Sequence, residues 1–165
     1  MWILVVTHVC QSRYFDDFKV GDKFVFLGRT ITDAENSLFA GICGDFNPGQ
    51  VNEEVAKKTY FGGRVIFGHL TLSIAIGQMT LIGVTQPTAV ALVGIDMAKF
   101  LAPVKIGDTI TPEIEILEKR ETSKPDRGLL TLRHTVRNQR NQLVFECESK
   151  VLLYRRPSRG AAGKR

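Results

Sequence analysis

The chain is predicted to fold as a single α+β domain, in which one long apolar helix is followed by an antiparallel sheet. Its length of 165 residues fits one domain of ordinary size. No Asp, Glu, Lys or Arg occurs between Arg64 and Asp96, and this stretch contains a helix-like apolar segment at 68–82. After that segment, strand-like runs alternate with turn signals up to residue 154. A curved sheet packed around one helix satisfies all three observations.

A first helix is predicted to begin at Asp33. Thr32 and Glu35 have the spacing of a capping box, in which each side chain bonds the backbone amide of the other residue. The helix should end at Gly44, because glycine adopts the positive φ of a C-terminal cap at little cost. Before this helix, residues 24–29 alternate weakly like a strand. The apolar residues of the predicted helix that fall at helical spacing are Leu38, Phe39 and Ile42.

Residues 45–50 are expected to form a loop after this helix. Asn52 can then cap a short helix over 53–57, because its side chain can accept hydrogen bonds from the first free amides. Acidic residues lie in the first turn of that helix and lysine in the last, as the helix dipole prefers. The glycines at 62–63 end it.

The segment 68–82 is predicted to be the central helix. It is apolar nearly all round, the pattern of a helix wrapped by other structure. A membrane span is excluded, because polar residues and a proline interrupt the uncharged stretch: Thr71, Ser73, Gln78, Thr80, Thr85, Gln86 and Pro87. Strands are predicted at 89–95, 97–100, 109–119, 129–138 and 143–154.

The net charge of +5 does not indicate a nucleic-acid partner. Five of the 22 basic residues and none of the 17 acidic ones lie in 155–165, so the rest of the chain is formally neutral. This Gly-, Ala- and Arg-containing end reads as a disordered solvated tail, with contact to a polyanion as the alternative. Cys10, Cys43 and Cys147 are widely spaced without a metal-binding spacing, which favours a reducing, cytoplasmic compartment and no metal.

The expected organisation is an N-terminal extension at 1–13, one domain at 14–154 and the basic tail at 155–165. The apolar run at 2–6 has no basic residue before it and is too short for a signal peptide, so we interpret it as part of the extension or as a strand. A sheet of this kind leaves an edge strand and an open face. Pairing with a second copy of the chain is one common way to cover them.

Three segments of the chain carry recognisable motifs. Residues Gly44–Ser73 read GDFNPGQVNEEVAKKTYFGGRVIFGHLTLS, residues 99–109 read KFLAPVKIGDT, and residues 138–142 read NQRNQ. In this order they resemble the MaoC-like and (R)-specific enoyl-CoA hydratase family. That family writes the first segment approximately as G-D-x-N-P-(apolar)-H-x-D-E, then A-K, then F-G-G-R-(apolar)-(apolar)-H-G, and the others as R-F-x-x-P-V-x-x-G-D and N-Q-x-G. The resemblance covers roughly residues 14–153.

The resemblance implies a hot-dog fold, in which an antiparallel sheet wraps around a long helix, and a homodimer or dimer of dimers with acyl thioester sites at the subunit interface. It also implies addition of water to trans-2-enoyl thioesters of coenzyme A or acyl carrier protein, or the reverse dehydration of (R)-3-hydroxyacyl thioesters. No cofactor is expected beyond the coenzyme A of the substrate. In the family an Asp and a His five residues later activate water, and a Gly amide binds the thioester oxygen. By position these residues are Asp45, Gln50 and Gly68, so glutamine replaces the histidine.

Hydration of an enoyl thioester needs a base for water, an acid for the α-carbon and a donor for the enolate oxygen. Asp45 can be the base, and its carboxylate is expected to be partly withdrawn from water beside Phe46; the alternative is a turn cap with Asn47. Gln50 can orient water or a carbonyl but does not titrate near neutral pH. Losing one partner of an acid/base pair costs about 100- to 10,000-fold in rate. An impaired hydratase, a noncatalytic acyl-CoA-binding protein and a thioesterase therefore all stay open.

The start of the central helix supplies the other candidates. The Gly68 amide suits an enolate oxygen, and a close helix–strand approach is the alternative reason for glycine. His69 follows Gly68, whereas the family more often has its histidine before the glycine, where Phe67 stands; His69 is either a buried hydrogen-bonded residue or a site residue. Further candidates to contact substrate, each with an ordinary structural alternative, are Asn47, Arg64, Lys57, Lys58 and Lys105 for polar groups and Phe46, Phe61 and Phe67 for the acyl chain.

Overall fold

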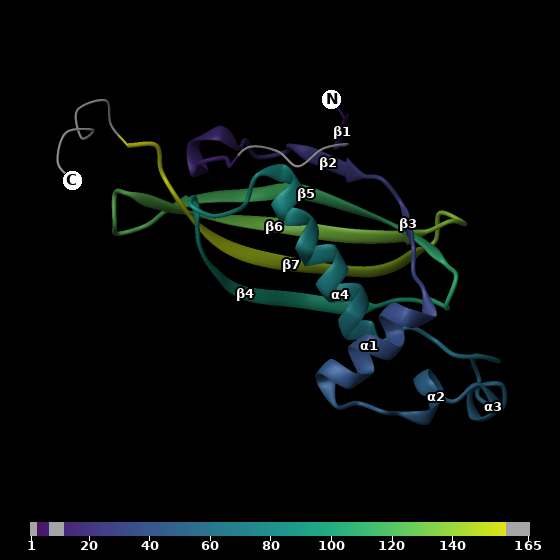
Figure 1. Ribbon diagram of the computed structural model, residues 1–165. Helices are drawn as coiled ribbons and strands as arrows, with labels where there is room; N and C mark the ends of the chain where they lie inside the picture. Colours follow the sequence, from purple (N-terminus) through teal and green to yellow (C-terminus); the bar gives the residue numbers. More distant parts are fainter. Residues whose placement is uncertain (1–2, 7–11, 158–165) are drawn as a thin grey trace.

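The computed structural model of the chain describes residues 3–6 and 12–157. Seven strands form one sheet with the order β1-β2-β5-β6-β7-β4, and β3 pairs with β5 beside this path (Figure 1). The strands are β1 (Ile3–Val6), β2 (Lys23–Phe26), β3 (Arg29–Thr30), β4 (Ala89–Phe100), β5 (Thr109–Glu121), β6 (Arg127–Asn138) and β7 (Leu143–Tyr154). Neighbouring strands are antiparallel except β1 and β2, whose parallel pairing the sequence did not predict.

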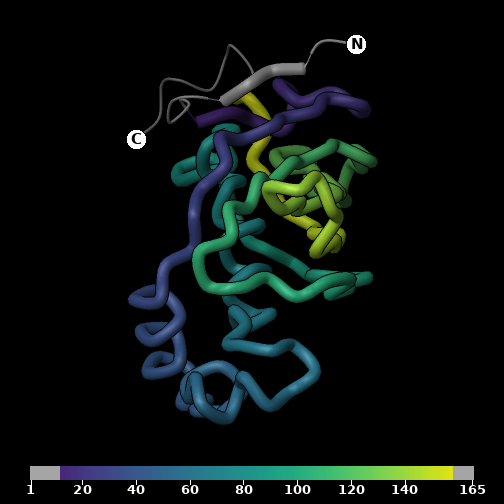
Figure 2. The backbone as a smooth tube through the Cα atoms, turned by 90° about the vertical axis from the view of Figure 1, so that its right-hand side faces the viewer, coloured from purple at the N-terminus to yellow at the C-terminus, as the bar shows by residue number. Residues whose placement is uncertain are grey.

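One helix crosses the sheet, and the other α-helices gather at one end of the molecule. The α-helices are α1 (Asp33–Cys43), α2 (Pro48–Val51), α3 (Glu53–Ala56) and α4 (Gly68–Gly77), and the 3₁₀ helices are η1 (Phe15–Asp17) and η2 (Gln78–Ile82). Figure 1 shows α4 running across the face of the sheet. Figures 1 and 2 show α1–α3 at the end of the molecule opposite β2. The predicted α+β layout is confirmed, and the central helix ends in a 3₁₀ continuation.

The caps of α1 form as the sequence predicts. The Glu35 amide donates to Thr32 Oγ1, and the Thr32 amide donates to Glu35 Oε2 at 2.8 Å. Gly44 closes the helix with φ at 70°. However, the residues of α1 that are buried are not the apolar residues at helical spacing. Asn36 and Ala40 are buried, whereas Leu38 and Ile42 are exposed.

The segment 45–50 is only partly a loop, which corrects the prediction. Pro48 begins the single-turn helix α2, because proline has a helical φ and gives up an amide that would be free in any case. The Asn47 side chain caps this turn by accepting from the Gly49 amide at 2.9 Å. The predicted cap of α3 is confirmed, since Asn52 accepts from two amides of its first turn at 3.0 and 3.1 Å.

The core lies between α4 and the sheet. On α4 the buried residues are Thr71, Ile74 and Ala75, which pack towards β6 and β7. His69 and Ser73 on the same helix are exposed. Within one chain the sheet therefore covers only one side of α4. The expectation that α4 is buried nearly all round holds for that side and not for the other.

β4 is the long edge strand of the sheet. The two strands predicted at 89–95 and 97–100 form one continuous element, with a register shift between Asp96 and Lys99 where Met97 has φ at 55°. Among the described residues β4 pairs with β7 alone. Large apolar side chains of this strand are exposed: Leu92, Val93, Ile95, Met97 and Phe100.

The first residues of the expected tail belong to the folded domain. Arg155 forms ion pairs of 3.0 Å with Asp16 and with Glu121, and Arg156 pairs with Asp17 at 2.8 Å. The rest of the expected tail, beyond Pro157, lies outside the described residues, as does Cys10. No helix in the part of the chain that the structure describes is long and apolar enough to cross a membrane.

Candidate active site

A hollow of about 530 Å³ opens beside the N-terminus of α4. Its walls come from α2, the segment before α4, the first turn of α4, the end of β4 with the chain that follows it, and β7. Most of the lining is apolar, as in sites that hold an acyl chain or another small ligand. The lining residues are Gln50, Tyr60, Phe61, Val65, Ile66, Gly68, Thr71, Phe100, Leu101, Ala102, Pro103, Val104 and Val144.

Gln50 is brought into this hollow by the turn of α2. Its side-chain Oε1 is buried and has no hydrogen-bond partner among residues 12–157. A buried acceptor without a partner costs about 1–3 kcal/mol, so this oxygen favours a ligand or water that donates a hydrogen bond. The backbone carbonyl of Gln50 accepts from Asn36 Nδ2 at 3.0 Å, which fixes α2 against α1.

Gly68 meets both descriptions that the sequence left open. It is the first residue of α4, where the amides have no acceptor within the helix and the dipole favours negative charge. It is also a point of close approach, because a Cβ built at Gly68 would lie 2.9 Å from Phe100 Cε1 and 3.0 Å from Cδ1. The hollow thus combines a helix N-terminus, an amide side chain and an aromatic wall.

Asp45 is not brought to the hollow within one chain. It is exposed beyond the end of α1, and its Oδ1 accepts from the Asn47 amide at 3.1 Å. The expectation that its carboxylate is withdrawn from water beside Phe46 is wrong for the single chain, because Phe46 is itself exposed. Asn47 is likewise exposed and caps α2 without lining the hollow. The turn-capping alternative is what this part of the structure displays.

The aromatic candidates separate into two groups. Phe61 lines the hollow, as expected for a residue near the acyl chain. Phe67 is buried and its ring lies 5.8 Å from that of Phe39, so it packs in the core instead. His69 is exposed and does not line the hollow; its ring lies edge-on to Phe100 at 6.5 Å. The expectation of a buried His69 is therefore wrong.

Arg64 is held by two carboxylates. Its guanidinium bonds both oxygens of Asp33, at 2.8 and 3.1 Å, and its Nε donates to Glu53 at 3.0 Å. These bonds raise the pKa of Arg64, the pair with Asp33 contributing most. The arginine thus ties α1 to α3, and this geometry does not support a contact with coenzyme A phosphates. Lys57 pairs with Glu54 at 2.9 Å, while Lys58 and Lys105 are exposed.

Two residues of the site were missed by sequence reasoning. Thr71 is buried one turn after Gly68 and lines the hollow. Asn36 does not line it but bonds the backbone on both sides of it, at Gln50 and at Phe67. The apolar pattern of α1 gave no signal for Asn36, because two residues that carry the pattern, Leu38 and Ile42, are exposed.

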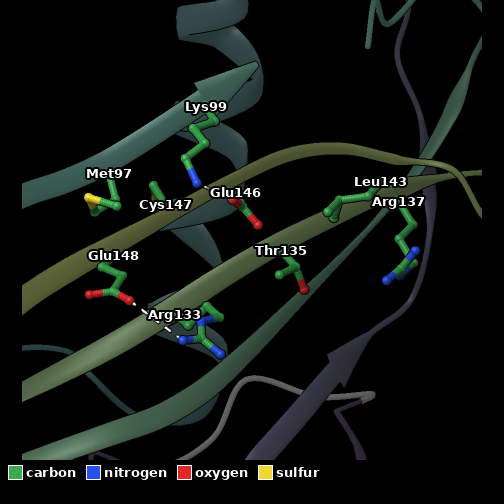
Figure 3. A pocket seen from close by; sticks show the side chains of 9 residues that line it. All are labelled: Met97, Lys99, Arg133, Thr135, Arg137, Leu143, Glu146, Cys147 and Glu148. Carbon is green, nitrogen blue, oxygen red and sulfur yellow. Dashed lines mark hydrogen bonds and ion pairs between the residues drawn. The ribbon is translucent and has the colours of Figure 1, made fainter. Parts of the chain in front are cut away.

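A second hollow lies on the opposite face of the sheet (Figure 3). Ser149 contacts Met79 of η2, on the helical side of the sheet, so Glu146 and Glu148 lie on the other face of β7. The charges here pair with one another, since Lys99 bonds Glu146 at 2.9 Å and Arg133 lies 3.6 Å from Glu148. Arg137 also lines this hollow of about 410 Å³ and donates to the Asn141 carbonyl at 3.1 Å, so two of the three basic lining residues are ion-paired with lining glutamates.

Neither a metal site nor a reactive thiol accompanies the first hollow. In the described ranges no cluster of three or more His, Cys, Asp or Glu side chains could hold a metal ion. Cys43 is a free, exposed thiol and Cys147 is buried in the core. Burial raises the pKa of Cys147 to about 11, which keeps it protonated and unreactive at neutral pH.

Comparisons with known proteins show the family of the chain. The family model described as a MaoC like domain matches residues 17–138. An (R)-specific enoyl-CoA hydratase from Rhodospirillum rubrum is 33% identical over 148 residues, covering 90% of this chain and 94% of that protein.

Solved structures show the same architecture. A protein from Archaeoglobus described as a monoamine oxidase regulatory protein superposes with a TM-score of 0.83 at 34% identity, covering 90% of this chain and 99% of its own. A Mycobacterium tuberculosis protein described as having a double hot-dog fold superposes with a TM-score of 0.79 at 24% identity, covering 89% of this chain and 46% of its own. The chain therefore has the hot-dog fold and belongs to the MaoC-like domain family.

Proposed function

We propose that the chain hydrates trans-2-enoyl thioesters, or dehydrates (R)-3-hydroxyacyl thioesters, in a site where Gln50 takes the place of the family's histidine. The observation that carries this proposal is that the Gln50 side chain and the N-terminus of α4 at Gly68 line one apolar hollow. The similarity to an (R)-specific enoyl-CoA hydratase over nearly its whole length supports the same reaction class. The acyl group lies along the apolar wall, and coenzyme A or acyl carrier protein stays outside.

In the proposed mechanism, the Gly68 amide donates a hydrogen bond to the thioester oxygen. The water oxygen bonds to the β-carbon, the double-bond electrons move towards that thioester oxygen, and the resulting enolate is stabilised at the helix N-terminus. Asp45 accepts the proton of the water and returns a proton to the α-carbon. Gln50 Oε1 accepts a hydrogen bond from the water and orients it, without taking the proton.

Asp45 joins this site in the proposed assembly of two copies. Leu38 and Ile42, one turn apart on α1, are 67% and 72% exposed, and Phe46 beside Asp45 is 64% exposed. Apolar patches of this kind mark interaction surfaces. A second copy that covers them would withdraw Asp45 from water and close the hollow.

The direct test is incubation of the full chain with crotonyl-CoA, following loss of enoyl absorbance and release of free thiol separately. Loss of enoyl absorbance without thiol supports the proposal. Release of thiol instead would indicate a thioesterase, in which one carboxylate directs water at the carbonyl. Binding of crotonyl-CoA with neither change would favour a noncatalytic acyl-CoA-binding protein, the alternative that the non-titrating Gln50 favours.

Gln50→His is expected to raise hydration of crotonyl-CoA at least about tenfold, equivalent to about 1.4 kcal/mol of barrier. The imidazole supplies a group with a pKa of about 6.5 that can relay a proton of the water, whereas glutamine only orients the water. Gln142→His, in the turn between β6 and β7, is the matched control and should leave the rate unchanged. If Gln50→His binds crotonyl-CoA as well as the parent does but gains no hydration, the site performs another chemistry or none.

The chain is expected to sediment as a dimer or a dimer of dimers. The unpaired edge of β4 and its exposed apolar side chains would otherwise face water. Val93→Lys places a charge on this edge and should shift the population towards monomer. A single species of 18.4 kDa for the parent at micromolar concentration would rule the dimer out.

A further inference from the structure

The side chain of Asn36 joins the two halves of the candidate site. Asn36 lies on α1 and is fully buried. Its Nδ2 donates to the backbone carbonyl of Gln50 at 3.0 Å, and its Oδ1 accepts from the backbone amide of Phe67 at 3.2 Å. One amide group therefore links α1 both to α2 and to the residue that caps α4.

These two bonds determine which polar groups of the site remain free to bind a ligand. The Phe67 amide is bound by Asn36, so Gly68 N–H is the next amide available to a ligand at the start of α4. The other bond runs from Asn36 to the backbone carbonyl of Gln50 and holds the backbone of that residue in place. The side-chain oxygen of Gln50 stays without a partner in the hollow. Asn36 thus fixes the backbones from which the two polar groups of the hollow project.

We infer that Asn36 is a positioning residue, which sets the separation between the Gln50 side chain and the Gly68 amide. This inference rests on the proposed function. The two positions that Asn36 connects, Gln50 and Phe67, are the two at which the family resemblance gives histidine. In this chain a neutral amide bridge links the backbones of both replacements.

A second buried asparagine provides a matched control. Asn138 also has its side chain bonded to backbone, since its Oδ1 accepts from the amides of Arg140 and Gln142 at 3.0 and 3.1 Å. It is the last residue of β6 and does not line the hollow. Asn138→Ala therefore removes a comparable set of bonds without touching the site.

Asn36→Ala is expected to lower kcat for crotonyl-CoA about tenfold with KM changed less than about threefold, because misplaced groups affect the transition state more than binding. Asn138→Ala should lose comparable thermal stability and keep the parent kcat at a temperature where both variants are folded. Asn36→Asp adds a pH readout. A protonated carboxyl can both donate and accept as the amide does, whereas the carboxylate cannot donate to the Gln50 carbonyl. The kcat of Asn36→Asp, divided by that of the parent at the same pH, should therefore rise as pH falls.

Equal losses of kcat in Asn36→Ala and Asn138→Ala, or an unchanged kcat in Asn36→Ala, would overturn the inference and leave the proposed function standing. If the parent binds crotonyl-CoA without hydrating it, the Kd of butyryl-CoA replaces kcat as the readout: about tenfold weaker binding in Asn36→Ala alone supports the inference, and equal binding overturns it. A parent that neither binds nor hydrates crotonyl-CoA would end the proposed function and, with it, the role of Asn36.

Discussion

Gly68→Ala is expected to lower kcat/KM for enoyl thioesters by about 100-fold, since a displacement of about 1 Å at a reacting site can cost that much. The new Cβ would lie 2.9 to 3.2 Å from three carbons of the Phe100 ring. The ring packs on one side at 5.1 Å against the fully buried Phe145, while 54% of Phe100 is exposed. Relief of this contact either shifts the first turn of α4 together with the Gly68 amide or turns the Phe100 ring, and both groups line the hollow. Overpacking of this kind also costs about 1–3 kcal/mol of stability.

Gly77→Ala is the matched control at the other end of the same helix. A Cβ there meets no atom within 4 Å, so it gains helix propensity without a clash. It should stabilise the fold by about 0.5–1 kcal/mol and leave kcat/KM unchanged. Urea unfolding and the crotonyl-CoA assay measure the two effects separately. If Gly68→Ala keeps the parent kcat/KM, the Gly68 amide does not bind the thioester oxygen as proposed.

The elements that sequence reasoning placed correctly are those specified by local chemistry. Thr32, Glu35 and Gly44 delimit α1 because caps depend on residues within one turn of each other. The same holds for Asn52 at the start of α3. Gln50 and Gly68, which the family resemblance pointed out, do share one hollow.

The features that sequence reasoning missed depend on contacts between elements that are distant in the sequence. The apolar residues of α1 suggested a buried face, yet Asn36 is buried there and Ile42 is exposed, because Asn36 finds backbone partners in α2 and before α4. Arg64 resembled a phosphate ligand until the fold placed Asp33 and Glu53 on either side of it. Such pairings join residues up to 31 positions apart, and neither periodicity nor spacing encodes them.

The exposure of Asp45 has a different origin. Its position after Gly44 is set locally, and local structure gives it the Asn47 amide as a partner. Whether water surrounds it depends on what covers Leu38, Ile42 and Phe46, and that surface is exposed in one chain. A carboxylate at an interface is therefore beyond what the pattern of a single sequence can place.

The folded chain is expected to lose about 3 kcal/mol of stability as pH falls from about 6.5 to about 4, through the buried His134. His134 lies on β6 under α4, with no exposed surface, and its Nε2 is 2.7 Å from Ser149 Oγ. Burial lowers the pKa of His134 from its ordinary value of 6.5 to about 4, an effect that the backbone of Ala75 partly offsets. The fold thus holds a neutral imidazole.

The sign follows from where each state takes up the proton. Above pH 6.5 His134 is neutral in both states, and its contribution is fully present. Between 6.5 and about 4 the unfolded chain binds the proton and the folded chain does not, so stability falls with pH. Below about 4 both states are protonated and the slope from this residue ends. The carboxyls whose pKa is lowered below 3.8 contribute at more acidic pH: Asp16, Asp33, Asp108 and Asp126.

Urea unfolding at a fixed protein concentration, at several pH values between about 4.5 and 7.5, measures this slope. His134→Gln is the comparison, because glutamine does not titrate and can still bond Ser149. The variant should be less stable than the parent at neutral pH, since it leaves part of the imidazole's volume unfilled. Its stability should nevertheless change little between pH 6.5 and 4.5, so the two curves converge as pH falls. Parallel curves for parent and variant would mean that His134 has the same pKa in the folded and unfolded states, so that burial does not hold it neutral.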